Sequence, residues 1–105
     1  MKKLSILAAA LIAGTALTAQ AGPAEDALNK AGCMACHAKD KKLVGPAFKD
    51  IAAKYKGQGD AIAKLSDKVR KGGSGNWGPV PMSPNGPEKI NDADLKIVIE
   101  SILKS

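Results

Sequence analysis

The stretch Cys33-Met34-Ala35-Cys36-His37 holds both cysteines and the only histidine of this 105-residue chain. On a helical turn, residues at positions i, i+3 and i+4 lie on one face, so two sulfurs and one imidazole project together. Two thiols placed this way can bond the vinyl groups of haem as thioethers, while a ring nitrogen coordinates the iron. The C-x-x-C-H spacing is typical of c-type haem attachment. We therefore expect one haem c, bound covalently through Cys33 and Cys36, with His37 as an iron ligand.

Other uses of two cysteines fit the sequence less well. A C-x-x-C disulfide closes a very small loop and removes little entropy from the unfolded chain. A redox dithiol normally accompanies a βαβ pattern, and we find no strand pattern in the sequence. A zinc site needs about four N, S or O ligands, and there is no second Cys/His cluster. A periplasmic thiol–disulfide protein stays open as an alternative.

Residues 1–21 have the layout of a secretory signal peptide. Lys2 and Lys3 form a basic start, a mostly apolar run covers residues 4–13, and Ala19-Gln20-Ala21 offers a small-x-small cleavage site. The apolar run is shorter than the ~20 residues that a membrane span needs. We expect cleavage after Ala21 and no stable membrane anchor.

The predicted mature domain, residues 22–105, is small for a self-supporting core. It has 84 residues (105 less 21), and its net charge is +4, because two lysines of the chain's +6 leave with the signal peptide. It contains one Phe, one Tyr and one Trp. Domains of this size bury little apolar surface and commonly need a further stabilising element. A large apolar cofactor tied in covalently would supply it.

Four helices are predicted, which gives an all-α fold. The first covers residues 23–31, and the second runs from Pro46, a residue suited to the first helical position, through Tyr55. The third is capped by Asp60 and ended by Gly72 and Gly73, with an apolar stripe of Ile62, Leu65 and Val69. The fourth is capped by Asn91, and its apolar face at residues 95, 98, 99 and 102 should pack against the first helix.

Residues 72–90 form an unusual segment between the last two helices. Nine of these 19 residues are Gly or Pro, and the segment carries Trp77 and Met82. Long connections without secondary structure are uncommon in compact domains unless they are functional or disordered. Prolines fix φ and stiffen a loop, so we expect an ordered arm that carries Met82 to a defined place, with disorder as the alternative.

Met82 is the candidate for the second axial position of the iron. The mature chain has no second histidine, and Met34 lies between the cysteines and turns away. A Met/His pair is a known haem ligand set, in which the thioether favours ferrous iron and raises the reduction potential. With both axial positions filled, no site is left for oxygen or peroxide, which favours electron transfer over catalysis. A haem peroxidase-like enzyme or a gas sensor with a labile Met82 is the alternative.

Three segments resemble the small bacterial class I monohaem cytochromes c of the five-fifty-one type. They are CMACH at 33–37, VGPAFKDIAAKY at 44–55 and WGPVPMSPN at 77–85, and the likeness extends over most of residues 24–104. The resemblance implies the class I cytochrome c fold, with about four helices wrapped around one covalently bound haem. It also implies a periplasmic one-electron carrier of a respiratory chain and not an enzyme.

The resemblance also implies roles for residues outside the motif. Pro46 offers its carbonyl to the ring N–H of His37, Trp77 hydrogen-bonds a haem propionate, and Asn85 lies near the Met82 sulfur as a donor.

Two further features come with the resemblance. Either Lys68 or Arg70 pairs with a propionate, and the sequence leaves the choice open. Ser83-Pro84 stands where relatives can carry two prolines after the ligand.

Lysines are dense on both sides of the haem-binding segment, and they predict the kind of partner. We expect a positive rim that meets acidic docking patches on periplasmic or membrane-bound redox proteins, through a small and transient interface. An exported chain with no aromatic–basic array is a poor nucleic-acid binder. We expect a monomer. The lysines are Lys30, Lys39, Lys41, Lys42, Lys49 and Lys54.

Overall fold

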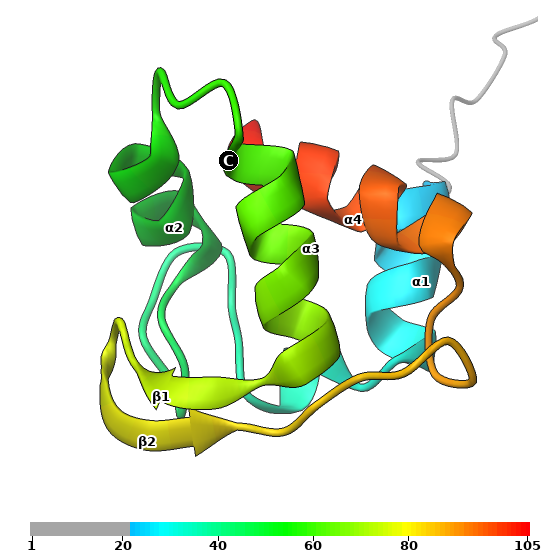
Figure 1. The fold of residues 1–105 in the computed structure, drawn as a ribbon, viewed down its shortest axis with the longest axis horizontal. Coiled ribbons are helices and arrows are strands. Elements are labelled where there is room, and N and C mark those ends of the chain that lie inside the picture. The colour runs from blue at the N-terminus through cyan, green and yellow to red at the C-terminus, as the bar shows by residue number, and fades with distance from the viewer. Residues whose placement is uncertain (1–21) are drawn as a thin grey trace, which may run out of the picture.

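The computed structural model describes residues 22–105, which form four α-helices, one 3-10 turn and a small two-stranded sheet (Figure 1). The predicted signal peptide, residues 1–21, lies outside the described residues. In chain order the elements are α1 (Pro23–Lys30), η1 (Cys33–Ala35), α2 (Phe48–Tyr55), α3 (Ala61–Lys71), β1 (Gly73–Gly75), β2 (Gly78–Met82) and α4 (Asp92–Leu103). The helical fold class predicted from the sequence is confirmed.

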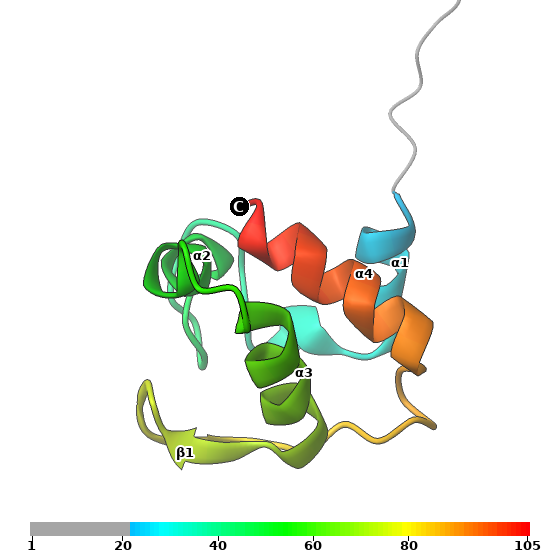
Figure 2. The ribbon, with the colours of Figure 1, turned by 45° about the horizontal axis from the view of Figure 1, so that its top comes forward.

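The core forms where α4 crosses α1 and packs against α2 and α3, an arrangement visible in both ribbon views (Figures 1 and 2). Leu95, Val98, Ile99 and Ile102 of α4 are all at least 93% buried, as their spacing predicts. The Asn91 side chain accepts a hydrogen bond from the Asp94 amide at 2.8 Å. This cap satisfies a backbone donor at the start of α4.

The second helix begins later than predicted. It starts at Phe48 with Ala47 as its N-cap, and Pro46 lies before it in the connecting loop. The carbonyl of Pro46 accepts from Nδ1 of His37 at 2.8 Å, and the amide of Asp50, its partner in a longer helix, donates to Ala47 at 3.1 Å. The amides of Phe48 and Lys49 donate to the carbonyls of Ala38 and Lys39, at 2.9 and 3.1 Å. The loop therefore folds back on the start of α2.

The third helix is rotated relative to the predicted stripe. Ala61 and Leu65 are buried and Val69 packs against the core, but Ile62 is 38% exposed. The inward face follows positions i, i+4 and i+8 from Ala61, which leaves Ile62 on the flank. Asp60 occupies the N-cap without a side-chain cap and instead pairs with Lys64 at 3.2 Å.

Residues 73–82 form an antiparallel β-hairpin, which contradicts the expectation of a chain without strands. Gly73 pairs with Met82 and Gly75 with Gly78, around a tip at Asn76 and Trp77. The hairpin extends beyond the lower end of α3, away from the C-terminus (Figures 1 and 2). Nearly all of its residues are exposed. Because neither face is buried, the sequence has none of the alternation that signals a strand.

Candidate haem-binding site

A cavity of about 300 Å³ brings the haem motif and the hairpin together. Cys33, Cys36 and His37 line it together with Met82. Its remaining wall is largely apolar and comes from all four helices, with Leu28, Phe48, Leu65 and Val98 among its residues. Residues that are 45 positions apart in the chain, His37 and Met82, therefore face one apolar space.

The 3-10 turn η1 gathers the residues of the motif. Gly32 precedes it in the left-handed conformation (φ 78°), and the amides of Cys36 and His37 both donate to the Cys33 carbonyl, at 3.2 and 3.0 Å. Both cysteines are free thiols, with Cys33 half-buried and Cys36 exposed. Burial raises the pKa of the Cys33 thiol; a backbone hydrogen bond partly opposes this, and the neighbouring Cys36 adds a smaller increase. Two thiols are thus available beside one imidazole.

The imidazole of His37 is held in a fixed orientation. Its Nδ1 lies 2.8 Å from the carbonyl oxygen of Pro46, and since a carbonyl only accepts, Nδ1–H is the donor. In the neutral ring this leaves the lone pair on Nε2, the atom that can bind a metal. The Phe48 ring stacks on the imidazole, with centroids 5.4 Å apart and planes 21° from parallel. The His37 ring is therefore held in one orientation, with Nε2 left free to coordinate a metal.

Gly45 is a site residue that the sequence reasoning missed. A Cβ atom at this position would lie 2.6 Å from Cε1 of His37, closer than real contacts allow. The Gly45 amide also donates to the Cys36 carbonyl at 2.8 Å. Only glycine lets the loop pass this close to the His37 ring, so that the Pro46 carbonyl can reach Nδ1. The available signal was the glycine directly before that proline.

Met82 ends β2 and is half-buried. Three residues later, Asn85 is 92% buried, and its backbone amide donates to the Val69 carbonyl at 2.9 Å. The Asn85 side-chain amide donates to the carbonyls of Val69 at 3.3 Å and Ser83 at 3.0 Å. Asn85 therefore ties the arm to α3, while its donation to the Met82 sulfur stays a prediction.

Trp77 lies at the hairpin tip, lines the cavity and is 40% exposed. The ammonium group of Lys54 sits 4.6 Å from the centre of its ring and donates to the Asn76 carbonyl at 3.2 Å. A cation over an indole face is attractive. Lys54, predicted only as a surface charge, thus connects the end of α2 to the hairpin.

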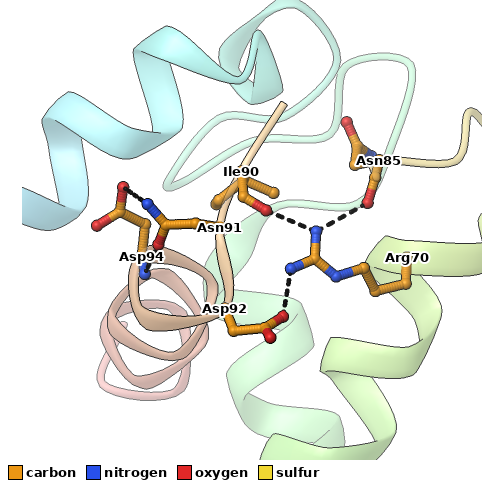
Figure 3. A network of polar contacts seen from close by, with 6 residues as sticks. All are labelled: Arg70, Asn85, Ile90, Asn91, Asp92 and Asp94. Carbon is orange, nitrogen blue, oxygen red and sulfur yellow. Dashed lines mark hydrogen bonds and ion pairs between the residues drawn. The ribbon is translucent and has the colours of Figure 1, made fainter. Parts of the chain in front are cut away.

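The structure separates the two basic residues offered for the propionate role. Arg70 directs its guanidinium to backbone carbonyls and to Asp92 (Figure 3). Lys68 is partly buried and lines the cavity. The position of Lys68 favours it as the residue that meets a propionate.

The chemistry of the donor set fits haem better than a bare metal ion. Within residues 22–105, no group of three or more His, Cys, Asp or Glu side chains is placed to hold a metal ion. His37 and Met82 would offer an imidazole nitrogen and a thioether sulfur, a pair that is known to bind haem iron. Two thiols at the cavity wall fit the covalent attachment of haem.

None of the helices in the described part of the chain is long and apolar enough to cross a membrane.

This fold and this site define a c-type cytochrome. The cytochrome c family model matches residues 23–104, and the chain belongs to that family. It is 52% identical over 85 residues to cytochrome c2 of Rubrivivax gelatinosus, covering 81% of this chain and 99% of that protein. It is 54% identical over 79 residues to cytochrome c-551 of Pseudomonas denitrificans, covering 75% and 93%. The crystal structure of wild-type Nitrosomonas europaea cytochrome c552 matches with a TM-score of 0.69 and 47% identity, covering 75% of this chain and 95% of that one.

Family membership establishes the cofactor and the general role. Members carry haem c and serve in electron transport, and Cys33 and Cys36 stand where one covalently bound haem is attached. The chain is a small class I monohaem electron carrier, as the resemblance implied.

Proposed function

We propose that this chain is a periplasmic one-electron carrier whose haem iron is bound by His37 and Met82. It shuttles electrons between respiratory redox proteins and is not an enzyme. The observation that carries the proposal is the shared cavity, which His37 and Met82 line together with both cysteines. Residues 1–21 would direct export and be removed after Ala21.

The two proposed ligands suit rapid and reversible electron transfer. The bound haem supplies an iron that alternates between the ferrous and ferric states. His37 is fixed by the Pro46 carbonyl and by Phe48, so its ring has little freedom to move. The Met82 thioether favours the ferrous state, and an apolar wall disfavours the extra charge of the ferric state. Because both residues would stay bound in the ferrous and the ferric state, electron transfer would need little rearrangement of the protein.

Other residues at the cavity would orient the cofactor and exclude water. Trp77 and Lys68 would meet the propionates. Asn85 would donate to the Met82 sulfur by releasing one of its two amide N–H groups from the Val69 or Ser83 carbonyl. Lys54 keeps Trp77 at the hairpin tip through the contact with its ring.

An optical spectrum of the reduced holoprotein, with and without carbon monoxide, tests the proposal. A six-coordinate c-type spectrum that carbon monoxide leaves unchanged is expected, because Met82 would hold the coordination site that the gas needs. Rapid binding of the gas would instead point to a haem enzyme or gas sensor with a labile methionine. Free thiols without haem would point to a thiol–disulfide protein.

Electron transfer to an acidic partner should slow as salt rises, because screening weakens steering between exposed charges. Between about 10 and 200 mM salt we expect roughly a tenfold loss in the second-order rate with an acidic redox protein. Lys41→Gln and Lys42→Gln together should flatten this dependence, since both side chains are exposed beside the motif. Stopped-flow measurement of the rate at each salt concentration checks it.

The matched control is Lys96→Gln on α4, where the lysine faces Glu100 at 3.8 Å on the same helix. It should leave the salt slope nearly unchanged. A wild-type rate that does not respond to salt would remove the positive rim from the proposed function.

A further inference from the structure

Arg70, in the last turn of α3, makes three contacts across to the segment that follows Met82. One terminal nitrogen, Nη1, donates to the carbonyls of Asn85 at 3.2 Å and Ile90 at 2.6 Å. The other, Nη2, donates to Oδ1 of Asp92 at 2.6 Å. Figure 3 shows the guanidinium in the middle of these groups. One side chain thus holds two points of the segment between Met82 and α4, and the first residue of α4.

The held segment, residues 83–91, has no helix or strand of its own and joins β2 to α4. Its fixed points are Asn85 and Ile90, which are 92% and 95% buried. Asn85 is also bound through its backbone to the carbonyl of Val69, the neighbour of Arg70. Both ends of the segment are therefore attached to the last turn of α3.

The hydrogen bonds from Arg70 to the two carbonyls hold the segment more strongly than its ion pair with Asp92 does. The Asp92 side chain is 94% exposed, so its attraction to Arg70 is screened by water and contributes little. The Arg70 side chain is only 20% exposed, and a charged donor to a buried carbonyl makes a stronger bond than a neutral one. The planar fork of arginine can serve three acceptors at once, which a lysine ammonium cannot do in the same geometry.

Met82 lies between two attachments. On its N-terminal side, β2 pairs with β1, where Gly73 is the partner of Met82. On its C-terminal side, the first fixed point is Asn85, whose carbonyl Arg70 binds. Without Arg70, this second attachment would rest on the hydrogen bonds between Asn85 and the Val69 carbonyl alone.

We propose that Arg70 is a positioning residue for Met82, and that it sets how readily the thioether leaves the iron. The inference rests on the proposed function, because it requires Met82 as a ligand. Arg70 touches neither the iron nor the sulfur; it acts through the backbone of the arm. Its guanidinium is committed to this clamp and is not the propionate partner.

The test is the rate at which imidazole displaces the methionine from the ferric holoprotein. Arg70→Ala should raise this rate by about tenfold or more, since the arm loses two charge-assisted hydrogen bonds. Amide hydrogen exchange at Asn85 should accelerate in the same variant, and the reduction potential should fall. Arg70→Lys should recover only part of each effect.

Two controls separate positioning from general stability. Asp92→Asn removes the exposed ion pair and keeps both carbonyl contacts, so imidazole binding should stay close to wild type. Ala27 is a buried residue of α1 that does not line the cavity. Ala27→Gly should weaken the helix and lower the unfolding temperature without a tenfold change in the rate of imidazole binding.

The failures of the two proposals can be told apart. If Met82→Ala admits imidazole rapidly but Arg70→Ala binds it at the wild-type rate, Met82 is a ligand and the role of Arg70 is wrong. If Met82→Ala behaves as wild type, the ligation itself is wrong. An Ala27→Gly rate equal to that of Arg70→Ala would reduce the effect of Arg70 to stability and overturn the inference.

Discussion

Replacing Met82 with alanine should lower the reduction potential and allow carbon monoxide to bind the reduced protein. Met82 lines the same cavity as His37, and alanine offers no atom that can coordinate iron. The potential should fall by on the order of 100 mV or more, because axial ligands set haem potentials over a range of roughly 0.8 V. Redox titration of the holoprotein and optical spectra with the gas measure both effects.

Met34→Ala is the matched control for this substitution. Met34 is also a methionine of the haem-binding region, but it is 37% exposed and lies between the two cysteines. Its replacement should leave the six-coordinate spectrum intact and move the potential little. An unchanged spectrum in Met82→Ala would falsify the ligand assignment. Loss of the haem spectrum in both the Met82→Ala and the Met34→Ala variant would point to failed haem attachment.

Replacing Gly72 with alanine should destabilise the fold and displace Met82. Gly72 adopts φ 65° and ψ −148°, a conformation that side chains rarely allow. A Cβ atom there would also collide with the carbonyl oxygen of Met82 and the backbone of Ser83 and Pro84. These are backbone atoms, so no rotamer change can relieve the overlap. We expect a loss of about 2–4 kcal/mol in unfolding free energy, from strain and displaced backbone together.

Gly57→Ala separates the strain of a positive φ from the collision with the backbone at Met82. Gly57 also has a positive φ, 78°, but nothing lies within 4 Å of a Cβ atom placed on it. It should cost only about 1–2 kcal/mol, the cost of a left-handed alanine. Chemical denaturation compares the stabilities, and imidazole binding to the ferric protein reports on Met82. Equal losses and equal imidazole rates in the two variants would show that the approach of Gly72 to Met82 is unimportant.

Local features of this protein were readable from the sequence because their causes are local. The turn that gathers Cys33, Cys36 and His37 depends only on the spacing of five residues. The capped start of α4 at Asn91 and its buried face depend on contacts within a few residues of each other. A helical period and a cap are both short-range signals.

Features that depend on distant contacts were missed or misplaced. Helix α2 starts at Phe48 and not at the predicted Pro46, because the Pro46 carbonyl binds the His37 ring and the Asp50 amide donates to Ala47. The hairpin at residues 73–82 had no alternating pattern because neither face is buried. Arg70 binds the carbonyls of Asn85 and Ile90, and no sequence pattern predicts that these residues lie beside α3.

The sequence by itself determined the cofactor and the class of protein, because covalent haem attachment is encoded in one turn of chain. Only the tertiary structure decided how His37 and Met82 are held. The His37 ring is fixed because Gly45 leaves room for it and the Pro46 carbonyl accepts a hydrogen bond from Nδ1–H. The segment that follows Met82 lies against the end of α3 because Gly72 leaves room for its backbone and Arg70 donates to two of its carbonyls. These are contacts of backbone with side chain across the fold, and they exist only once the helices have packed.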